Sequence, residues 1–208
     1  MPSIPERRPT NGPGFVFVGE HPAIDFANTL LMLDGRETDR LQAWADVIDW
    51  LSLAGLSVDP GLKLPAPLGA EALKSVLELR QAWKAELVRL ISGSKLSDAF
   101  IARLNRLLAN DTYHEELHRD GSRIVHLERS HSLLHGAQLA HALLGRQIAV
   151  FLAEANLSYL RRCANTTSCG LYFYDTTKNH RRQWCSVAVC GNRHKVAQFR
   201  QRQTKAKG

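Results

Sequence analysis

The chain has 208 residues, of which 44% are hydrophobic and 23% are charged, a composition that allows one sizeable globular domain with or without a small appendage. It contains no run of about 18 apolar residues and no secretory signal at its start, so we expect a cytoplasmic protein without a membrane partner.

The positive charge is concentrated at the C-terminal end. The net charge is +7, but the residues from Arg161 to Gly208 hold eleven Lys and Arg against one acid, Asp175, which gives +10. The preceding 160 residues hold 16 Lys and Arg against 19 Asp and Glu, which gives −3. This asymmetry predicts a polyanionic partner, most commonly nucleic acid, whereas the alternative is a solvated basic tail.

The first half of the chain predicts a mainly helical domain behind a proline-rich flexible tail at residues 1–13. Phe15–Val18 resembles a short strand, and the mixed apolar stretch that follows predicts a helix from about Pro22. Three further helices are indicated by apolar residues at helical spacing. The first of these begins near Leu41 and ends at Gly55, and the second runs through residues 73–91. The third begins at Ser97, which serves as its N-cap.

A hairpin and one more helix complete this domain. The stretch "TYHEELHRDGSRIVHLER" predicts two strands joined by a turn at Asp120-Gly121. The helical period returns at about Ser130 and predicts a helix that reaches about Tyr159. The fold class is therefore mainly α (α+β): a helical domain with a β-hairpin over residues 14–160, followed by a small C-terminal module.

All four cysteines lie in that C-terminal module. Cys163 and Cys169 are separated by five residues, and Cys185 and Cys190 are separated by four, with fifteen residues between the pairs. Two close pairs at this distance predict a tetrahedral site for one structural zinc ion, because four thiolates leave no open position for catalysis. Two disulfides are the alternative, but a cytoplasmic chain keeps its thiols reduced.

The residues around the cysteines predict a treble-clef-like finger. We expect Gly170 to turn the chain out of the first cysteine pair, and residues 171–177 to pair with residues 180–184 across a turn at Lys178-Asn179. Ser186 is a natural N-cap for a last helix that carries Cys190. Three apolar residues are expected to pack beneath this helix: Val187, Val196 and Phe199.

The polar residues of the finger are candidates for nucleic-acid contacts. Arg and Asn match guanine and adenine edges, and Lys and Arg also suit phosphates. The candidate residues are Arg181, Arg182, Asn192, Arg193, Lys195, Arg200 and Arg202. For Asn192 and Arg193 an alternative role is to brace the second cysteine pair through backbone carbonyls.

The stretch "CANTTSCG … RRQWCSVAVCGNRHKV" resembles the CGNR zinc-finger family, named for the tetrad that begins at Cys190. "GEHPAIDFANT" resembles the opening of the ABATE domain, which precedes this finger in bacterial proteins described as stress-induced transcription regulators. The resemblance implies zinc ligands at the four cysteines. It also implies a DNA-binding finger at 161–203, with a basic tail at 204–208, behind a sensing or dimerising domain at 14–160. The first cysteine pair departs from the family pattern, because five residues separate its members where four are expected.

Three weaker signals lie in the helical domain. Asp25, Asn28 and Thr29 share one helix face and could form a ligand pocket, joined by His21, although such residues more often cap neighbouring elements. His131 and His135 have metal-ligand spacing but lie opposite the leucine stripe, so a surface pair is expected. Trp44, Trp50 and Trp83 lie at apolar helical positions and are expected in the core.

We interpret the chain as a zinc-finger DNA-binding regulator, with a homodimer and a small-molecule effector as possible partners. It has no phosphate-binding loop, nucleophile elbow or paired carboxylates, so an enzyme is not expected. Three alternatives stay open. One is an RNA- or ribosome-associated zinc protein, another is a small-molecule-binding or enzymatic N-terminal domain with a structural zinc module, and the third is a thiol redox switch.

Overall fold

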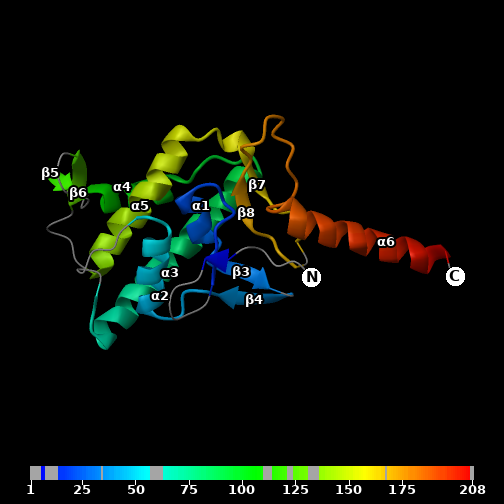
Figure 1. Cartoon of the computed structure of the whole chain (residues 1–208), viewed down its shortest axis with the longest axis horizontal. Helices are drawn as coiled ribbons and strands as arrows, with labels where there is room; N and C mark the ends of the chain where they lie inside the picture. Colours follow the sequence, from blue (N-terminus) through cyan, green and yellow to red (C-terminus); the bar gives the residue numbers. More distant parts are fainter. Residues whose placement is uncertain are drawn as a thin grey trace.

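The computed structural model describes residues 6–7, 14–33, 35–56, 63–109, 114–120, 124–130, 136–166 and 168–206. It has the predicted mainly α fold, with a helical body, small antiparallel hairpins and the cysteines gathered at the C-terminal end. Figure 1 shows the helices packed together in the body and the last helix, α6 (Asn192–Ala206), projecting from it. In the described part of the chain, no helix combines the length and hydropathy needed to cross a bilayer.

The long helix α3 (Ala66–Ile91) is the centre of the body. Its buried positions recur every three or four residues, so one face points inward along the helix. That face carries Val76, Leu79, Trp83 and Leu87, each 0% exposed. Around it pack α1 (Pro22–Ala27), α2 (Trp44–Leu53), α4 (Asp98–Ala109) and α5 (Gly136–Glu154). Trp44, Trp50 and Trp83 all lie in this core, as predicted.

The predicted helix at Pro22 is much shorter than the apolar stretch that suggested it. It ends at Ala27, where the Thr29 hydroxyl donates to the Phe26 carbonyl, and the chain turns into a hairpin. The strands β3 (Leu30–Leu33) and β4 (Arg36–Asp39) form this hairpin around Gly35, whose φ of 80° favours glycine. Upstream, β2 (Phe15–Val16) pairs with β1 (Glu6–Arg7), which lies inside the segment expected to be a tail.

Buried polar groups hold this hairpin and α1 against α3. Arg80 is 3% exposed, and its guanidinium donates to both carboxylate oxygens of Asp39, at 2.7 and 2.5 Å, and to the Thr29 hydroxyl at 3.0 Å. The Trp83 indole donates to the Ala23 carbonyl at 2.8 Å, and Lys84 Nζ donates to the Leu30 carbonyl at 2.9 Å. One face of α3 therefore holds α1 through Ala23 and the hairpin through Leu30 and Asp39.

The predicted hairpin in the second half is confirmed as β5 (His114–Asp120) and β6 (Ile124–Ser130), paired from His114↔Ser130 to Asp120↔Ile124. Gly121 of its turn lies outside the described residues, as do His131 and His135. The last body helix, α5, ends at Glu154 rather than near Tyr159. Asn156 then caps a single 3-10 turn, η2 (Leu157–Tyr159), by accepting the Ser158 N–H at 3.1 Å.

The strand pairing predicted inside the finger is wrong. β8 (Tyr172–Tyr174) pairs with β7 (Leu160–Arg162), which directly precedes the first cysteine, and not with residues 180–184. The physical reason is Asp175, a fully buried carboxylate that accepts the backbone N–H groups of Thr177 and Arg182, at 3.0 and 2.8 Å. The returning segment is therefore held by one side chain, and it needs no strand ladder.

Candidate metal centre

Two short loops present the four cysteines. The first loop follows β7: the Cys163 N–H donates to the Leu171 carbonyl at 2.8 Å, and the Cys169 N–H donates to the Asn165 carbonyl at 2.9 Å. Gly170 has a φ of +74° and lies against the Arg162 guanidinium, so a side chain here would be strained and crowded. The predicted role of Gly170 is confirmed.

The second loop leads directly into the last helix. The Ser186 side chain accepts the Val189 N–H at 3.3 Å, which confirms Ser186 as the N-cap. Cys190 lies in the single π-helical turn η3 (Val187–Gly191), which is followed without a break by α6. A backbone bond from the Ala164 N–H to the Gln183 carbonyl, at 2.9 Å, joins the two loops.

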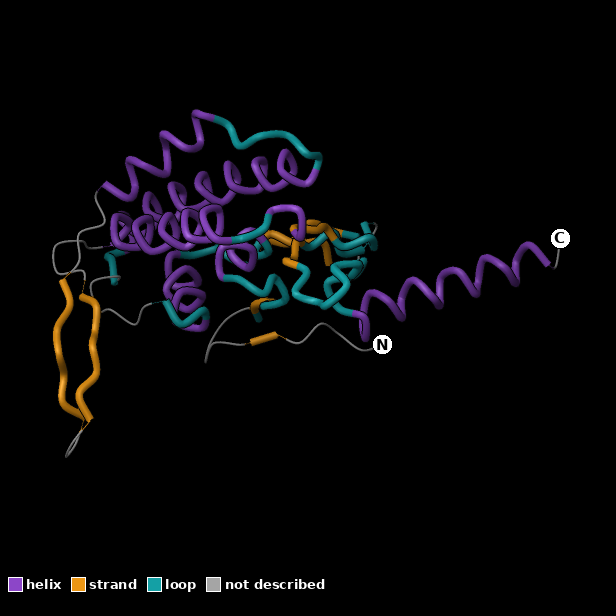
Figure 2. The backbone as a smooth tube through the Cα atoms, turned by 90° about the horizontal axis from the view of Figure 1, so that it is seen from above, coloured by secondary structure: helices purple, strands orange, loops and turns teal. Residues whose placement is uncertain are grey.

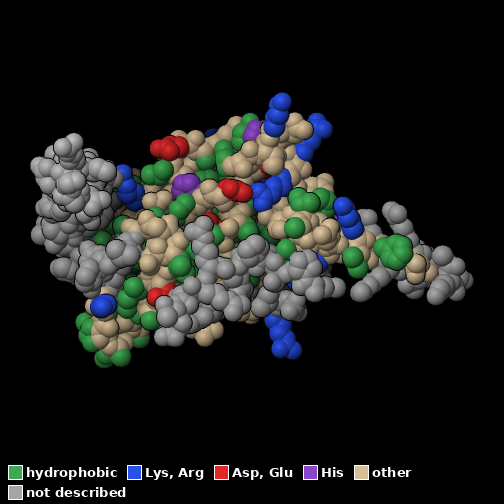
Figure 3. Space-filling model, viewed as in Figure 1, with side chains coloured by type: hydrophobic (Ala, Val, Ile, Leu, Met, Phe, Trp, Pro, Cys, Tyr) green, Lys and Arg blue, Asp and Glu red, His purple; other side chains and the backbone are tan. Residues whose placement is uncertain are grey.

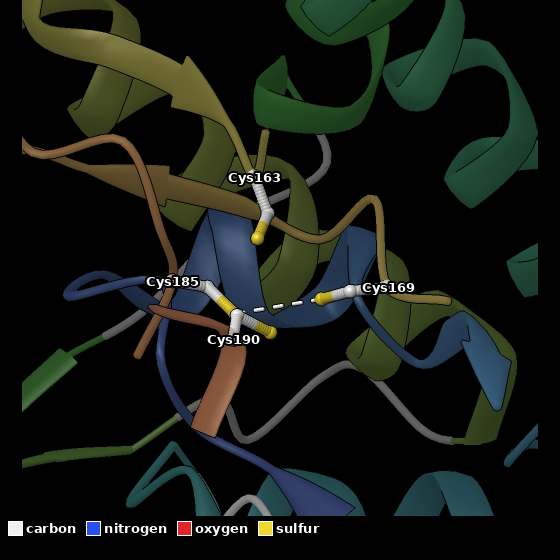
Figure 4. Close-up of side chains that lie close together, drawn as sticks. All are labelled: Cys163, Cys169, Cys185 and Cys190. Atoms are coloured by element: carbon white, nitrogen blue, oxygen red, sulfur yellow. Dashed lines mark hydrogen bonds between the residues drawn. The ribbon is translucent and has the colours of Figure 1, made fainter. Parts of the chain in front are cut away.

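The four sulfurs converge on one point (Figure 4). Every pair of Sγ atoms lies within 4.8 Å, with 3.5 Å between Cys169 and Cys185 and 3.7 Å between Cys185 and Cys190. Zinc–sulfur bonds of about 2.3 Å in a tetrahedron place the sulfurs about 3.8 Å apart, whereas a disulfide requires about 2.05 Å. The arrangement fits one structural zinc ion held by Cys163, Cys169, Cys185 and Cys190.

The thiols already influence one another chemically. Hydrogen bonds from the thiols of Cys169, Cys185 and Cys190, in that order, lower the pKa of the Cys163 thiol. Hydrogen bonding with the Cys163 thiol has the opposite effect at Cys169 and Cys185, where it raises the pKa, so the cluster does not favour all four thiolates alike. A divalent cation bound among the four sulfurs would stabilise every thiolate.

Apolar side chains enclose the metal centre, and two of them come from the helical body. The cysteines are 0–3% exposed and share a cluster with Leu171, Phe173 and Val189 of the finger and with Val16 and Leu31 of the body. An apolar enclosure of this kind limits solvent access to the thiolates. The centre is therefore completed by residues more than 130 positions upstream.

Arg182 braces the second cysteine loop from inside. Its guanidinium donates to the Cys185 carbonyl, to the Trp184 carbonyl at 2.9 Å and to Glu20 at 3.0 Å, and it lies 4.7 Å from the centre of the Phe173 ring. We predicted Arg182 as a nucleic-acid contact, but its guanidinium donates its hydrogen bonds to groups within the protein. Its neighbour Arg181 is exposed, as a nucleic-acid contact requires.

Asp175 is the important finger residue that sequence reasoning missed. Burial acts to raise the pKa of its carboxyl, but hydrogen bonds from Thr177 and from the Arg182 backbone outweigh burial and lower the pKa. The carboxylate therefore stays ionised while it organises the loop between β8 and Cys185. The available signal was its position as the single acid among eleven basic residues.

Asp25, Asn28 and Thr29 are buried, and their hydrogen bonds connect protein segments. Asp25 accepts the N–H groups of Val18 and Gly19, at 2.9 and 2.7 Å. Asn28 is bonded twice to the backbone of Tyr172, donating to its carbonyl at 2.8 Å and accepting its N–H at 2.9 Å. Thr29 accepts from Arg80. These bonds support the capping role that we weighed against a ligand pocket, and Asn28 joins the body to the finger.

His21, which was expected to join these three side chains, caps a helix and lines a cavity. Its Nδ1 accepts the Ala23 N–H at 3.1 Å and so caps α1, and burial lowers the pKa of its imidazole. The ring lines a shallow cavity of about 260 Å³ together with residues of α5 and Tyr174. None of Asp25, Asn28 and Thr29 lines this cavity.

The polar candidates on the last helix differ in their surroundings. Lys195 is exposed and Arg193 is half-buried, whereas Asn192 donates to the Ala188 carbonyl at 2.9 Å, the bracing role weighed for it. Arg200 and Arg202 are on α6, but their side chains lie outside the described residues.

The three apolar residues expected to pack beneath this helix do not do so. Val187 is 59% exposed, Val196 is 41% exposed and Phe199 is 61% exposed. That prediction is wrong because α6 leaves the finger instead of folding back over it (Figures 1 and 2).

Two family profiles match the chain. The ABATE profile, described as "Putative stress-induced transcription regulator", matches residues 20–155, and the profile of the CGNR zinc finger matches residues 159–203. No curated protein matches.

Proposed function

Because the chain belongs to the ABATE family and carries a CGNR zinc finger at its C-terminal end, we propose that it is a transcription regulator that binds double-stranded DNA through α6. A bacterial origin and the stress response suggested by the family's description are part of this proposal. So are the pairing of two copies and the sensing of a small-molecule effector by the helical body. The proposal gives the chain a binding role and no catalytic step.

The observation that carries the proposal is the position of α6 directly after a zinc ligand. Cys190 is followed after one residue by the first residue of the helix, so the metal centre fixes the start and direction of α6. The helix contains five Lys and Arg residues and no acid. It projects away from the body in both views, with nothing of the body beside its outer turns (Figures 1 and 2).

The charge distribution supports a polyanionic ligand at this end. Figure 3 shows Lys and Arg side chains exposed on the surface of the finger, with hydrophobic side chains beside them on α6. A projecting helix fits the major groove of B-form DNA, which is about 12 Å wide. The major groove of A-form RNA is too narrow for side chains to read, so the shape favours DNA over RNA duplexes.

The first prediction concerns the charge of α6. We expect the double variant Arg200→Gln/Arg202→Gln to bind a random 20-bp DNA duplex more weakly than the wild type. We also expect the slope of log K against log salt to become less steep by about 1 to 2, because each phosphate contact contributes about 0.9. Fluorescence anisotropy of a labelled duplex across a salt series measures both quantities.

The matched control is Lys74→Gln/Lys95→Gln, which removes the same charge from exposed positions on the body and should leave the slope unchanged. Equal effects of the two double variants would contradict a role for α6. Tighter binding to duplex RNA or to single strands than to duplex DNA would replace the proposal with the RNA alternative. No binding to any of them at low salt would refute both.

A further inference from the structure

One face of α6 carries four exposed side chains in register. Asn192, Val196, Phe199 and Gln203 follow one another at intervals of four, three and four residues, and all four are exposed. At 3.6 residues per turn they fall within about 60° of one another around the helix axis. They form a single stripe about 16 Å long, which we call the α6 stripe.

The α6 stripe faces away from the side by which the helix is attached. His194 lies about 200° from Asn192 around the axis, and its ring contacts Trp184 of the finger with 5.8 Å between ring centroids. Asn192 Nδ2 donates one hydrogen to the Ala188 carbonyl, which leaves its second hydrogen and its Oδ1 available. The attachment therefore fixes the direction in which the stripe points.

Cations border the α6 stripe on both sides. By helical periodicity, Lys195 lies on one flank, about 60° from the stripe's first residue. Arg193 lies on the opposite flank, at about 100°. A helix in a major groove has bases in front of it and a phosphate backbone on each side, so this order of side chains matches the order of groups in the groove.

The side chains of the stripe select among the bases. Asn and Gln form paired hydrogen bonds with the N6 and N7 atoms of adenine, and apolar side chains contact the C5 methyl group of thymine. Both kinds are present, in the order amide, apolar, apolar, amide. We propose, on the basis of the function proposed above, that α6 reads A·T base pairs in the major groove, with Val196 and Phe199 packed on thymine methyl groups.

The same observations argue against a second copy of the chain as the occupant of this surface. Two α6 helices packed stripe to stripe would bring together Arg193 and Lys195 of both copies, and α6 contains no acid to pair with them. A DNA groove covers the exposed Phe199 ring and neutralises the flanking charges at the same time. Since base pairs are spaced 3.4 Å apart, the stripe spans about five of them.

The test uses thymine and uracil, which differ by the methyl group alone. Two pools of 20-bp duplexes share their flanks, and the ten central pairs are randomised as A·T in one pool and as G·C in the other. We expect zinc-loaded wild type to bind the A·T pool more tightly, and to lose about fourfold in affinity per contacted methyl group when uracil replaces thymine. Anisotropy competition at one fixed salt concentration measures each ratio.

Phe199→Ala should reduce the loss on uracil substitution, while Val187→Ala, which removes an exposed apolar side chain outside the stripe, should keep it. Duplex binding with equal affinity for the two pools, or with no effect of uracil, overturns this inference and leaves the proposed function standing. Binding confined to single strands or RNA, or no binding at all, overturns both.

Discussion

Arg181 and Arg182 are adjacent in sequence but have different surroundings. Arg181 is exposed, whereas the Arg182 side chain is mostly buried and is bonded to two carbonyls of the second cysteine loop and to Glu20. Hydrogen bonds from a charged group contribute about 1.5–3 kcal/mol each to stability. Substituting each arginine in turn therefore separates a role in metal retention, expected for Arg182, from a role in nucleic-acid contact, expected for Arg181.

We expect Arg182→Gln to release zinc to a chelator at least about tenfold faster than the wild type, since a loss of about 1.4 kcal/mol corresponds to a factor of ten. Arg181→Gln should release zinc at the wild-type rate but bind DNA more weakly. A colorimetric chelator follows the release, and anisotropy follows DNA binding. Similar release rates for the two variants would show that the bonds of Arg182 do not stabilise the loop.

Lys84 gives a prediction about pH. Burial, reinforced by the nearby charge of Arg80, lowers the pKa of its ammonium group from 10.5 to about 8. Between these two pH values the unfolded chain binds more protons than the folded one, so the contribution of Lys84 to the free energy of unfolding increases as pH rises. Below about pH 8 the ammonium is charged in both states, and the cost of burying this charge lowers the free energy of unfolding by its full amount.

The check is urea denaturation of the wild type and of Lys84→Met at intervals from pH 7 to 10.5. We expect the wild type to gain stability relative to the variant as pH rises. Lys74→Met, at an exposed position on the same helix, should show no such trend. A constant difference between wild type and Lys84→Met over this interval would contradict the lowered pKa.

Among the elements, the long helices and the metal centre could be predicted from sequence. Their signals are local: apolar residues at helical spacing, an N-cap at Ser97, and two close cysteine pairs. The hairpin β3–β4 could not be predicted, because Leu30–Leu33 is a continuous apolar run that continues the preceding helical pattern and Arg36–Asp39 is wholly polar. Its position depends on Arg80, which is more than 40 residues away.

The pairing of β7 with β8 could not be predicted from the sequence for a similar reason. Strands of three residues carry almost no periodic signal, and the buried carboxylate of Asp175 decided which segment returns beside them. The contribution of Val16 and Leu31 to the wall of the metal centre is a property of the assembled fold. Sequence spacing identified the ligands of the centre but not the side chains that enclose it.

At the scale of the whole molecule, body and finger form one folded unit. Tyr172 of β8 lies in the core of the body, and its backbone is bonded twice to Asn28, which is 2% exposed. Removing the Asn28 amide leaves a buried N–H and a buried carbonyl without partners, at about 1–3 kcal/mol for each.

We therefore expect Asn28→Ala to lower the free energy of unfolding by about 2–6 kcal/mol and to accelerate zinc release, although the two hydrogen bonds removed go to Tyr172 and not to a cysteine. Urea unfolding by tryptophan fluorescence, with zinc release recorded on the same samples, tests both. Asn105→Ala on the exposed side of α4 is the matched control. A destabilised body with an unchanged release rate would show that the two parts act independently.

The wall around the zinc ion has a consequence for how this architecture can be inherited. Val16 and Leu31 enclose the thiolates, and Asn28 holds β8. We therefore expect the finger to be less stable when it is moved into another protein without the body. Grafted onto another protein, residues 159–203 would bring their four ligands but leave Val16 and Leu31 of the enclosure behind. We therefore expect recombination that separates the two segments to weaken the metal centre, which favours the joint inheritance of body and finger.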